Sequence, residues 1–110
     1  MADFTLKQND LAPAIIGTLK SAGGAVKNLS TASSVVFKMG TSTGTLKVNE
    51  TITPFDAAGG VCRYQWAAGD TDTAGTFFAE FEVTNADGTK ETFPNEKPLT
   101  ITIKADKLPL

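Results

Sequence analysis

The stretch Thr-Phe-Phe-Ala-Glu-Phe-Glu-Val-Thr, residues 76–84, decides the fold. Every second side chain in it is apolar: Phe77, Ala79, Phe81 and Val83. Successive side chains of a β-strand point to opposite faces, so this alternation predicts a strand with one face in an apolar core. The two glutamates fall on the other face together with Phe78. We expect Phe78 to be exposed or covered by a partner protein, and we treat it as an interface candidate.

Shorter alternating stretches lie on both sides of this segment, with turn residues between them. Asp87-Gly88 is the strongest turn signal, because both residues tolerate positive φ. The alternation within residues 45–53 places Leu46 and Val48 on one face. Besides residues 76–84, the predicted strands are residues 3–8, 14–20, 34–39, 45–53, 61–66, 90–93 and 99–103.

This spacing of short strands predicts one all-β domain, an immunoglobulin-like antiparallel β-sandwich of seven or eight strands. No segment has the periodicity of an amphipathic helix. A chain of 110 residues has the usual size of one domain. We place the sandwich in residues 1–106 and a short C-terminal tail in residues 107–110.

The charge and the apolar pattern exclude two classes of partner. The formal net charge is −2, and the ten basic residues are scattered along the chain. A nucleic-acid-binding surface needs clustered basic residues, so we expect no nucleic-acid partner. No apolar run approaches the roughly 20 residues that span a membrane, so we expect no membrane partner. The first residues lack the pattern of a signal peptide, which predicts synthesis in the cytoplasm.

The residues available for chemistry predict that the protein is not an enzyme. The chain has no histidine, which removes the commonest general base and the commonest metal ligand. Cys62 is the only cysteine, so no intrachain disulfide can form. Its place on an apolar strand face predicts a small buried side chain rather than a nucleophile. We therefore expect no catalytic residue, no cofactor and no metal site.

Two segments superficially resemble ligand-binding loops. Residues 40–45 lack the Gly-Lys-Ser/Thr ending of a phosphate loop, and we interpret them as a hairpin loop. Asp70 and Asp72 precede a glycine, as in half of a calcium loop, but Phe81 stands where the distal glutamate would be. We interpret residues 70–75 as a polar corner that leads into the strand at residues 76–84.

Trp66 is the only tryptophan. It shares its predicted strand face with Cys62 and Tyr64, which favours a core position over an exposed ligand-stacking position. We expect Trp66 and Tyr64 to pack in the core against residues from other predicted strands, namely Phe77, Phe81 and Ile101.

The predicted edge strands are residues 3–8 and 99–104, both with few charges. Exposed edges invite pairing unless charges or partners cover them. The chain ends in Lys-Leu-Pro-Leu, whose Leu108 and Leu110 form an apolar tip. This tip is either a frayed tail or a segment that docks in a neighbouring subunit, and we treat Leu108 and Leu110 as interface candidates together with Phe78.

Residues 60–94 carry a pattern that resembles a known family. Compatible features precede it: Phe4-x-Leu6, Asn28-Leu29-Ser30 and Val35-Val36-Phe37-Lys38. The pattern itself consists of Gly60-Val61-x-x-Tyr64-x-Trp66, Asp70-Thr71, Gly75-Thr76-Phe77-x-Ala79-Glu80-Phe81-x-Val83, Asp87-Gly88, Glu91-Thr92 and Phe93-Pro94. It resembles the N-terminal immunoglobulin-like domain of phage baseplate upper proteins, and the resemblance extends over nearly the whole chain.

The resemblance implies a non-enzymatic structural subunit of a tailed-phage particle, as a baseplate or peripheral tail component. Such a subunit would be made in the host cytoplasm, reside in the virion and contact other virion proteins in multiple copies. A capsid decoration protein is one alternative. A carbohydrate- or surface-binding adhesive module is another, for which Phe55 and Phe93 are the aromatic residues in predicted turns.

Overall fold

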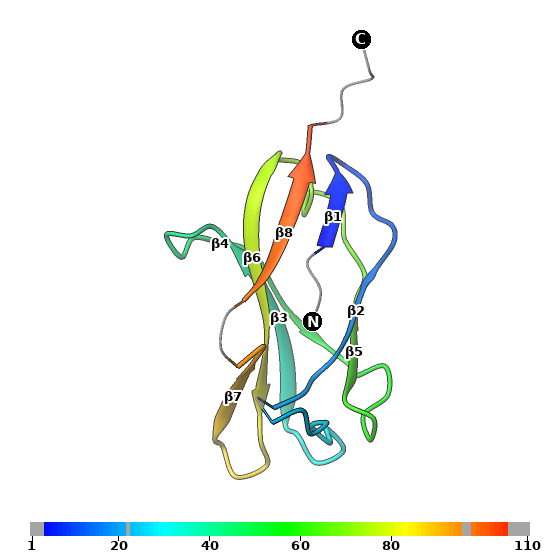
Figure 1. Ribbon diagram of the computed structural model, residues 1–110, viewed down its shortest axis with the longest axis vertical. Coiled ribbons are helices and arrows are strands. Elements are labelled where there is room, and N and C mark those ends of the chain that lie inside the picture. Colours follow the sequence, from blue (N-terminus) through cyan, green and yellow to red (C-terminus); the bar gives the residue numbers. More distant parts are fainter. Residues whose placement is uncertain (1–3, 22, 96–97, 106–110) are drawn as a thin grey trace.

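The computed structural model describes residues 4–21, 23–95 and 98–105, which form eight strands and no helix (Figure 1). Within these residues, no helix could therefore cross a membrane. In chain order the strands are β1 (Phe4–Lys7), β2 (Ile15–Thr18), β3 (Ser34–Gly40), β4 (Leu46–Ile52), β5 (Val61–Tyr64), β6 (Gly75–Thr84), β7 (Lys90–Phe93) and β8 (Leu99–Lys104).

The strands form two sheets, as expected for an immunoglobulin-like sandwich. The larger sheet has the order β1-β8-β6-β3-β4, and β7 pairs with the second half of β6. The smaller sheet consists of β2 and β5, paired antiparallel. Inward side chains of both sheets belong to one buried apolar cluster. The prediction of an all-β sandwich with seven or eight strands is confirmed.

Strand β6 organises the larger sheet. One side of β6 pairs with β3 over most of its length. The other side pairs first with β8 and then with β7, and Pro94, which cannot donate to a ladder, follows the end of β7. The four alternate apolar residues of β6 are all buried, as the sequence predicted: Phe77, Ala79, Phe81 and Val83.

Two predictions about the sheet were wrong. Strand β1 pairs with β8 in parallel, so the sandwich is not wholly antiparallel. The two strands lie at opposite ends of the chain, and no short hairpin forces them to run in opposite directions. Residues 99–104 are not an edge, because β8 lies between β1 and β6; the open edges of this sheet lie on β1, as predicted, on β4 and on β7, which pairs with β6 alone.

Trp66 is buried in the core, with 2% of its surface exposed. Its indole N–H donates a hydrogen bond to the carbonyl of Pro13 at 3.1 Å. Phe77, Phe81 and Ile101 belong to the same buried cluster, as predicted. The predicted set omitted two of the rings that contact Trp66. These contacts, given by ring-centroid distance, are Tyr64 at 5.4 Å, Phe37 at 5.8 Å and Phe4 at 6.0 Å.

Candidate interaction surface

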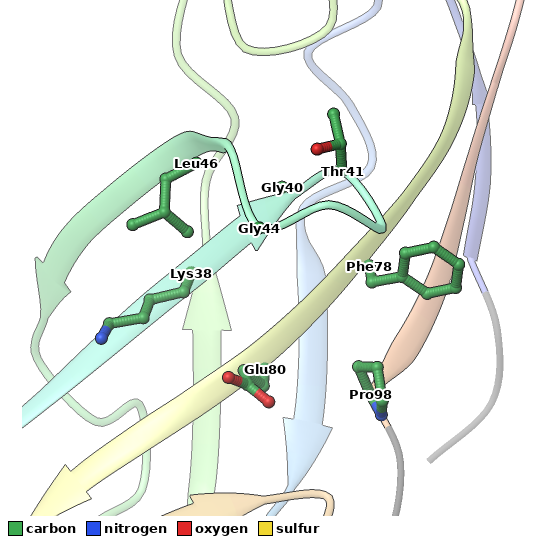
Figure 2. A pocket seen from close by; sticks show the side chains of 8 residues that line it. All are labelled: Lys38, Gly40, Thr41, Gly44, Leu46, Phe78, Glu80 and Pro98. Carbon is green, nitrogen blue, oxygen red and sulfur yellow. The ribbon is translucent and has the colours of Figure 1, made fainter.

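The outer face of the larger sheet carries a shallow hollow of about 150 Å³. Phe78 and Pro98 stand on one side of it and Leu46 on the other, below the loop that joins β3 to β4 (Figure 2). A second hollow, of about 330 Å³, adjoins it and shares Phe78 and Pro98. The complete lining of the first hollow is Lys38, Gly40, Thr41, Gly44, Leu46, Phe78, Glu80 and Pro98.

The glycines of the β3–β4 loop give this surface its shape. Gly40 is buried at an irregularity in the pairing of β3 with β4, and a Cβ there would lie 2.5 Å from the carbonyl oxygen of Thr45. Gly44 has a φ of 93°, which favours glycine. The amide of Thr41 donates to the carbonyl of Thr45 at 3.0 Å and closes the loop. Residues 40–45 thus connect two strands, in agreement with the interpretation as a hairpin loop.

The irregularity at Gly40 also exposes Leu46. The sequence alternation placed Leu46 and Val48 on one face, and this prediction was wrong, because Val48 is buried whereas Leu46 is 50% exposed. Gly40 pairs with Leu46, whereas Met39 pairs with Val48, so Lys47 is an additional residue in β4. A bulge of this kind disrupts the regular alternation of side chains. It turns Leu46 into an apolar wall of the hollow.

Charged side chains lie next to the apolar residues of the hollow. Lys38 Nζ lies 3.2 Å from an oxygen of Glu82, and Lys90 Nζ lies 3.5 Å from its other oxygen. The hydrogen bond from Lys38 holds the pKa of Glu82 below its usual value, with a smaller contribution from Lys90. Phe78 itself is half-buried. An apolar centre beside polar groups is a common arrangement in protein interfaces.

The structure places one of the three interface candidates on this surface. Phe78 lies where the alternation predicted, on the face of Glu80 and Glu82. Leu108 and Leu110 lie outside the described residues, so their docking stays a prediction. The contributions of Pro98 and Leu46 were not predicted, since they depend on the order of the strands rather than on a local motif.

The polar corner was predicted at residues 70–75, and its hydrogen bonds reach back to Ala67. The Asp70 carboxylate accepts hydrogen bonds from the Tyr64 hydroxyl and from the Ala67 amide, the latter at 2.8 Å. Asp72 forms an ion pair with Lys47 at 2.7 Å. Each carboxylate therefore serves the corner, as expected. The role of the Tyr64 hydroxyl was not predicted, and its signal in the sequence is a tyrosine six residues before an aspartate.

We expect this corner to make the free energy of unfolding depend on pH in the alkaline range. Burial is the main cause that raises the pKa of Tyr64 above its ordinary value of about 10, and the hydrogen bond to Asp70 adds to it. The folded state then holds the proton more tightly than the unfolded state. The resulting stability is complete below about pH 10 and declines as the pH rises further, by at most about 1.4 kcal/mol per pH unit.

The substitution Tyr64→Phe removes this dependence. Urea denaturation between about pH 9 and pH 11 should show the wild type losing stability faster than the variant. Other titrating groups are common to both chains and cancel in the difference. Tyr64 is the only tyrosine, so its phenolate absorbance reports the same ionisation directly. Parallel stability curves, or an ordinary titration of Tyr64 in the folded protein, would contradict this account.

Within the described residues, no three His, Cys, Asp or Glu side chains are grouped as a metal site would require. The carboxylates of Asp70 and Asp72 already have partners within the protein. We expect millimolar calcium to leave the melting temperature unchanged relative to the same concentration of magnesium. A rise in melting temperature specific to calcium would show that the corner binds the ion.

Cys62 is fully buried on the inner face of β5. Burial raises the pKa of its thiol to about 11, which keeps the group protonated near neutral pH. The thiolate is the reactive form of cysteine, so the protonated Cys62 side chain is unreactive. It acts as a small apolar core residue, as predicted.

The two aromatic residues that would support an adhesive role differ in exposure. Phe93, which ends the predicted strand at residues 90–93 and was also counted with the aromatic residues in turns, is the last residue of β7 and only 1% exposed. Its register with Phe81 directs it into the core. Phe55 is 65% exposed, and the guanidinium carbon of Arg63 lies 6.0 Å from its ring centroid.

Comparisons with known proteins bear on the fold. No protein-family model matches the chain, and no curated protein matches it at a significant level. Among solved structures, the chain is similar to CopC from Methylosinus trichosporium OB3b, with a TM-score of 0.54 and 13% sequence identity. The similarity covers the whole of this chain and 91% of that one. At this identity it shows a shared fold, and the chain is an all-β, immunoglobulin-like sandwich.

Proposed function

We propose that the chain is a non-enzymatic structural subunit of a tailed-phage particle, in the baseplate or at the periphery of the tail. It acts through contacts with other virion proteins and is present in several copies. The resemblance of residues 60–94 to the immunoglobulin-like domain of baseplate upper proteins supports this role. The structural observation that supports it best is the surface around Phe78.

The physical case for a protein partner rests on Phe78. A half-buried aromatic side chain between two hollows can be buried further by a partner at little cost in conformational entropy. Leu46 and Pro98 extend the apolar area around it. The nearby ion pair between Lys38 and Glu82 stays within the protein, so a partner need not supply a compensating charge. Such features favour a protein contact over a polar small ligand.

An adhesive module is the second candidate, because Phe55 is exposed and could stack on a sugar ring. The Arg63 guanidinium lies near the ring of Phe55 and would compete for it. A hollow of about 440 Å³ lies at the other end of β3 and has no aromatic lining. These observations favour the structural role.

We expect the substitution Phe78→Ala to reduce incorporation into particles about tenfold, as for the loss of an interface anchor. The variant is supplied from a plasmid during growth of a phage that lacks the gene, and its copies are counted in purified particles. Phe55→Ala is the matched control, since it truncates the same residue type on another surface. Melting temperatures of both variants confirm that they are folded.

Equal incorporation of the Phe78 and Phe55 variants would show that the Phe78 surface does not hold the chain in the particle. Loss of incorporation with Phe55→Ala but not with Phe78→Ala would favour the adhesive surface instead. Incorporation into capsids that lack tails would identify a capsid decoration protein.

A further inference from the structure

Open strand edges in this protein differ in how they are protected. Charged side chains on an edge strand oppose pairing with another molecule, and bulges have the same effect. Strand β1 carries Lys7, β4 carries Lys47 and Glu50 as well as the bulge, and β7 carries Lys90 and Glu91. Strand β2 has the sequence Ile-Ile-Gly-Thr, without charge or proline. It is the least protected edge among the described strands.

The other strand of the small sheet has its outer side partly covered. The amides of Phe55 and Asp56 donate to the carbonyl of Val61 at 2.9 Å and 3.1 Å, and the Val61 amide donates to the carbonyl of Asp56. Strand β5 thus has neighbours on both sides. Among the described residues, strand β2 pairs with β5 alone, so no described strand covers its second side.

The direction of the β2 backbone groups follows from the ladder. The amide of Leu19 donates to the carbonyl of Gly60 at 2.8 Å, on the side of β5. In an antiparallel pair, the backbone groups of alternate residues point to the same side. Ile15 and Gly17 therefore direct their N–H and C=O groups toward β5, whereas Ile16 and Thr18 direct theirs to the open side. The Ile16 side chain is 57% exposed on the outer face.

We propose that β2 pairs antiparallel with β2 of a second copy of this chain, about a twofold axis at Gly17. Ile16 of each copy then lies opposite Thr18 of the other, and each such pair exchanges N–H···O bonds in both directions. The two small sheets become one continuous sheet with the order β5-β2-β2-β5. This inference is independent of the particle role proposed above.

The sequence of β2 fits a second copy of itself. A twofold axis at Gly17 places the two glycines opposite each other as a non-hydrogen-bonded pair, where strands approach most closely, at about 4.5 Å between Cα atoms. Glycine has no side chain to obstruct this approach. No charge on β2 faces its own copy across the axis. The exposed Ile16 side chain of each copy lies opposite Thr18 of the other on the same outer face, and this cross-strand pair covers part of its apolar surface.

The dimer leaves the Phe78 surface open. That surface lies on the outer face of the larger sheet, whereas β2 belongs to the smaller sheet. Each dimer therefore presents two copies of the hollow, related by the twofold axis. A paired subunit of this kind could contact two neighbouring copies of one partner protein.

Sedimentation equilibrium of the purified full chain tests the proposal. Because the shared edge is short, we expect a weak dimer, seen as a rise in mass from about 11.5 kDa toward twice that value between about 10 μM and 1 mM. Ile16→Lys should abolish this rise by placing a charge at the edge. Ile16→Pro should also abolish it, since proline is tolerated where the missing N–H faced the open side. Leu46→Lys, at a similarly exposed position on β4, should dimerise as the wild type does.

Amide hydrogen exchange identifies the contact. We expect the amides of Ile16 and Thr18 to become protected as the concentration rises, while that of Gly17 is protected throughout. A wild type that stays monomeric at 1 mM would overturn the proposal. It would do so even if β2 were found to accept a strand from another protein. Dimers that persist in both Ile16 variants, or that leave Ile16 and Thr18 exchanging rapidly, would overturn it too. None of these outcomes depends on whether the chain is found in particles.

Discussion

We expect Trp66→Ala to lower the free energy of unfolding by about 3–5 kcal/mol, one of the two largest effects of a single substitution predicted here. The indole lies between rings from β1, β3 and β5, and its removal leaves a cavity that these rings can fill only by shifting from their packed positions. The carbonyl of Pro13 also loses its donor. Because a domain of this size is stable by only about 5–15 kcal/mol, urea denaturation should resolve the loss clearly.

The variant Trp66→Phe is the matched control. It keeps an aromatic ring in the core but removes the N–H, so it should lose less stability than the alanine variant. The single tryptophan also permits a direct check on the wild type, whose emission should be blue-shifted and shielded from quenchers. A red-shifted emission that quenchers reach in the folded protein would contradict the burial of Trp66.

Gly60→Ala should lower the free energy of unfolding by roughly 2–5 kcal/mol. Gly60 has a φ of 68°, which costs an alanine about 1–2 kcal/mol. A Cβ at this position would also lie 2.5 Å from the carbonyl oxygen of Lys27 and 2.8 Å from a methyl carbon of Val26. That oxygen belongs to a residue whose own amide is held by a hydrogen bond to the carbonyl of Leu19.

Gly44→Ala separates these two causes. Gly44 has a φ of 93°, but a Cβ there would meet no atom within 4 Å. Its loss should be limited to the backbone cost of about 1–2 kcal/mol. Urea denaturation of the two variants gives the comparison. If both variants lost the same free energy of unfolding, the close contact at Gly60 would relax without adding to the backbone cost.

The sequence predicted the strands because their signal is local. The alternation in residues 76–84 is strong enough to place Phe77 and Phe81 in the core and Phe78 on the opposite face, as observed. The predicted strand bounds differ from the observed ones mainly at their ends. The longest discrepancy is at residues 14–20, of which only Ile15–Thr18 form β2, since the following residues turn toward the bridge between Lys20 and Val26.

The order and the direction of the strands leave no comparable signal in the sequence. A two-residue period is the same for a parallel and an antiparallel strand, so it could not reveal that β1 runs parallel to β8. The bulge between Met39 and Gly40 is also absent from the pattern, and it reverses the prediction for Leu46. Its sequence correlate is Gly40, whose close approach to Thr45 excludes a Cβ.

The candidate surface was predicted only through Phe78. The hollow depends on Leu46 and Pro98, which the order of β4, β3, β6 and β8 brings to one face. No local motif joins these residues, so strand composition could indicate one apolar residue on a polar face but not the surface around it. The open edge of β2 was likewise hidden, because the sequence does not show which strands pair.

Quantitative mass spectrometry of gradient-purified particles is the most direct test of the structural role. Particles are treated with nuclease and washed in high salt, and the chain is counted relative to the major capsid protein. We predict a constant ratio across the particle peak, with several copies of the chain per virion, retained through the wash and present in isolated tails. Absence of the chain from intact particles, or its complete removal by the wash, would contradict a role as a virion subunit.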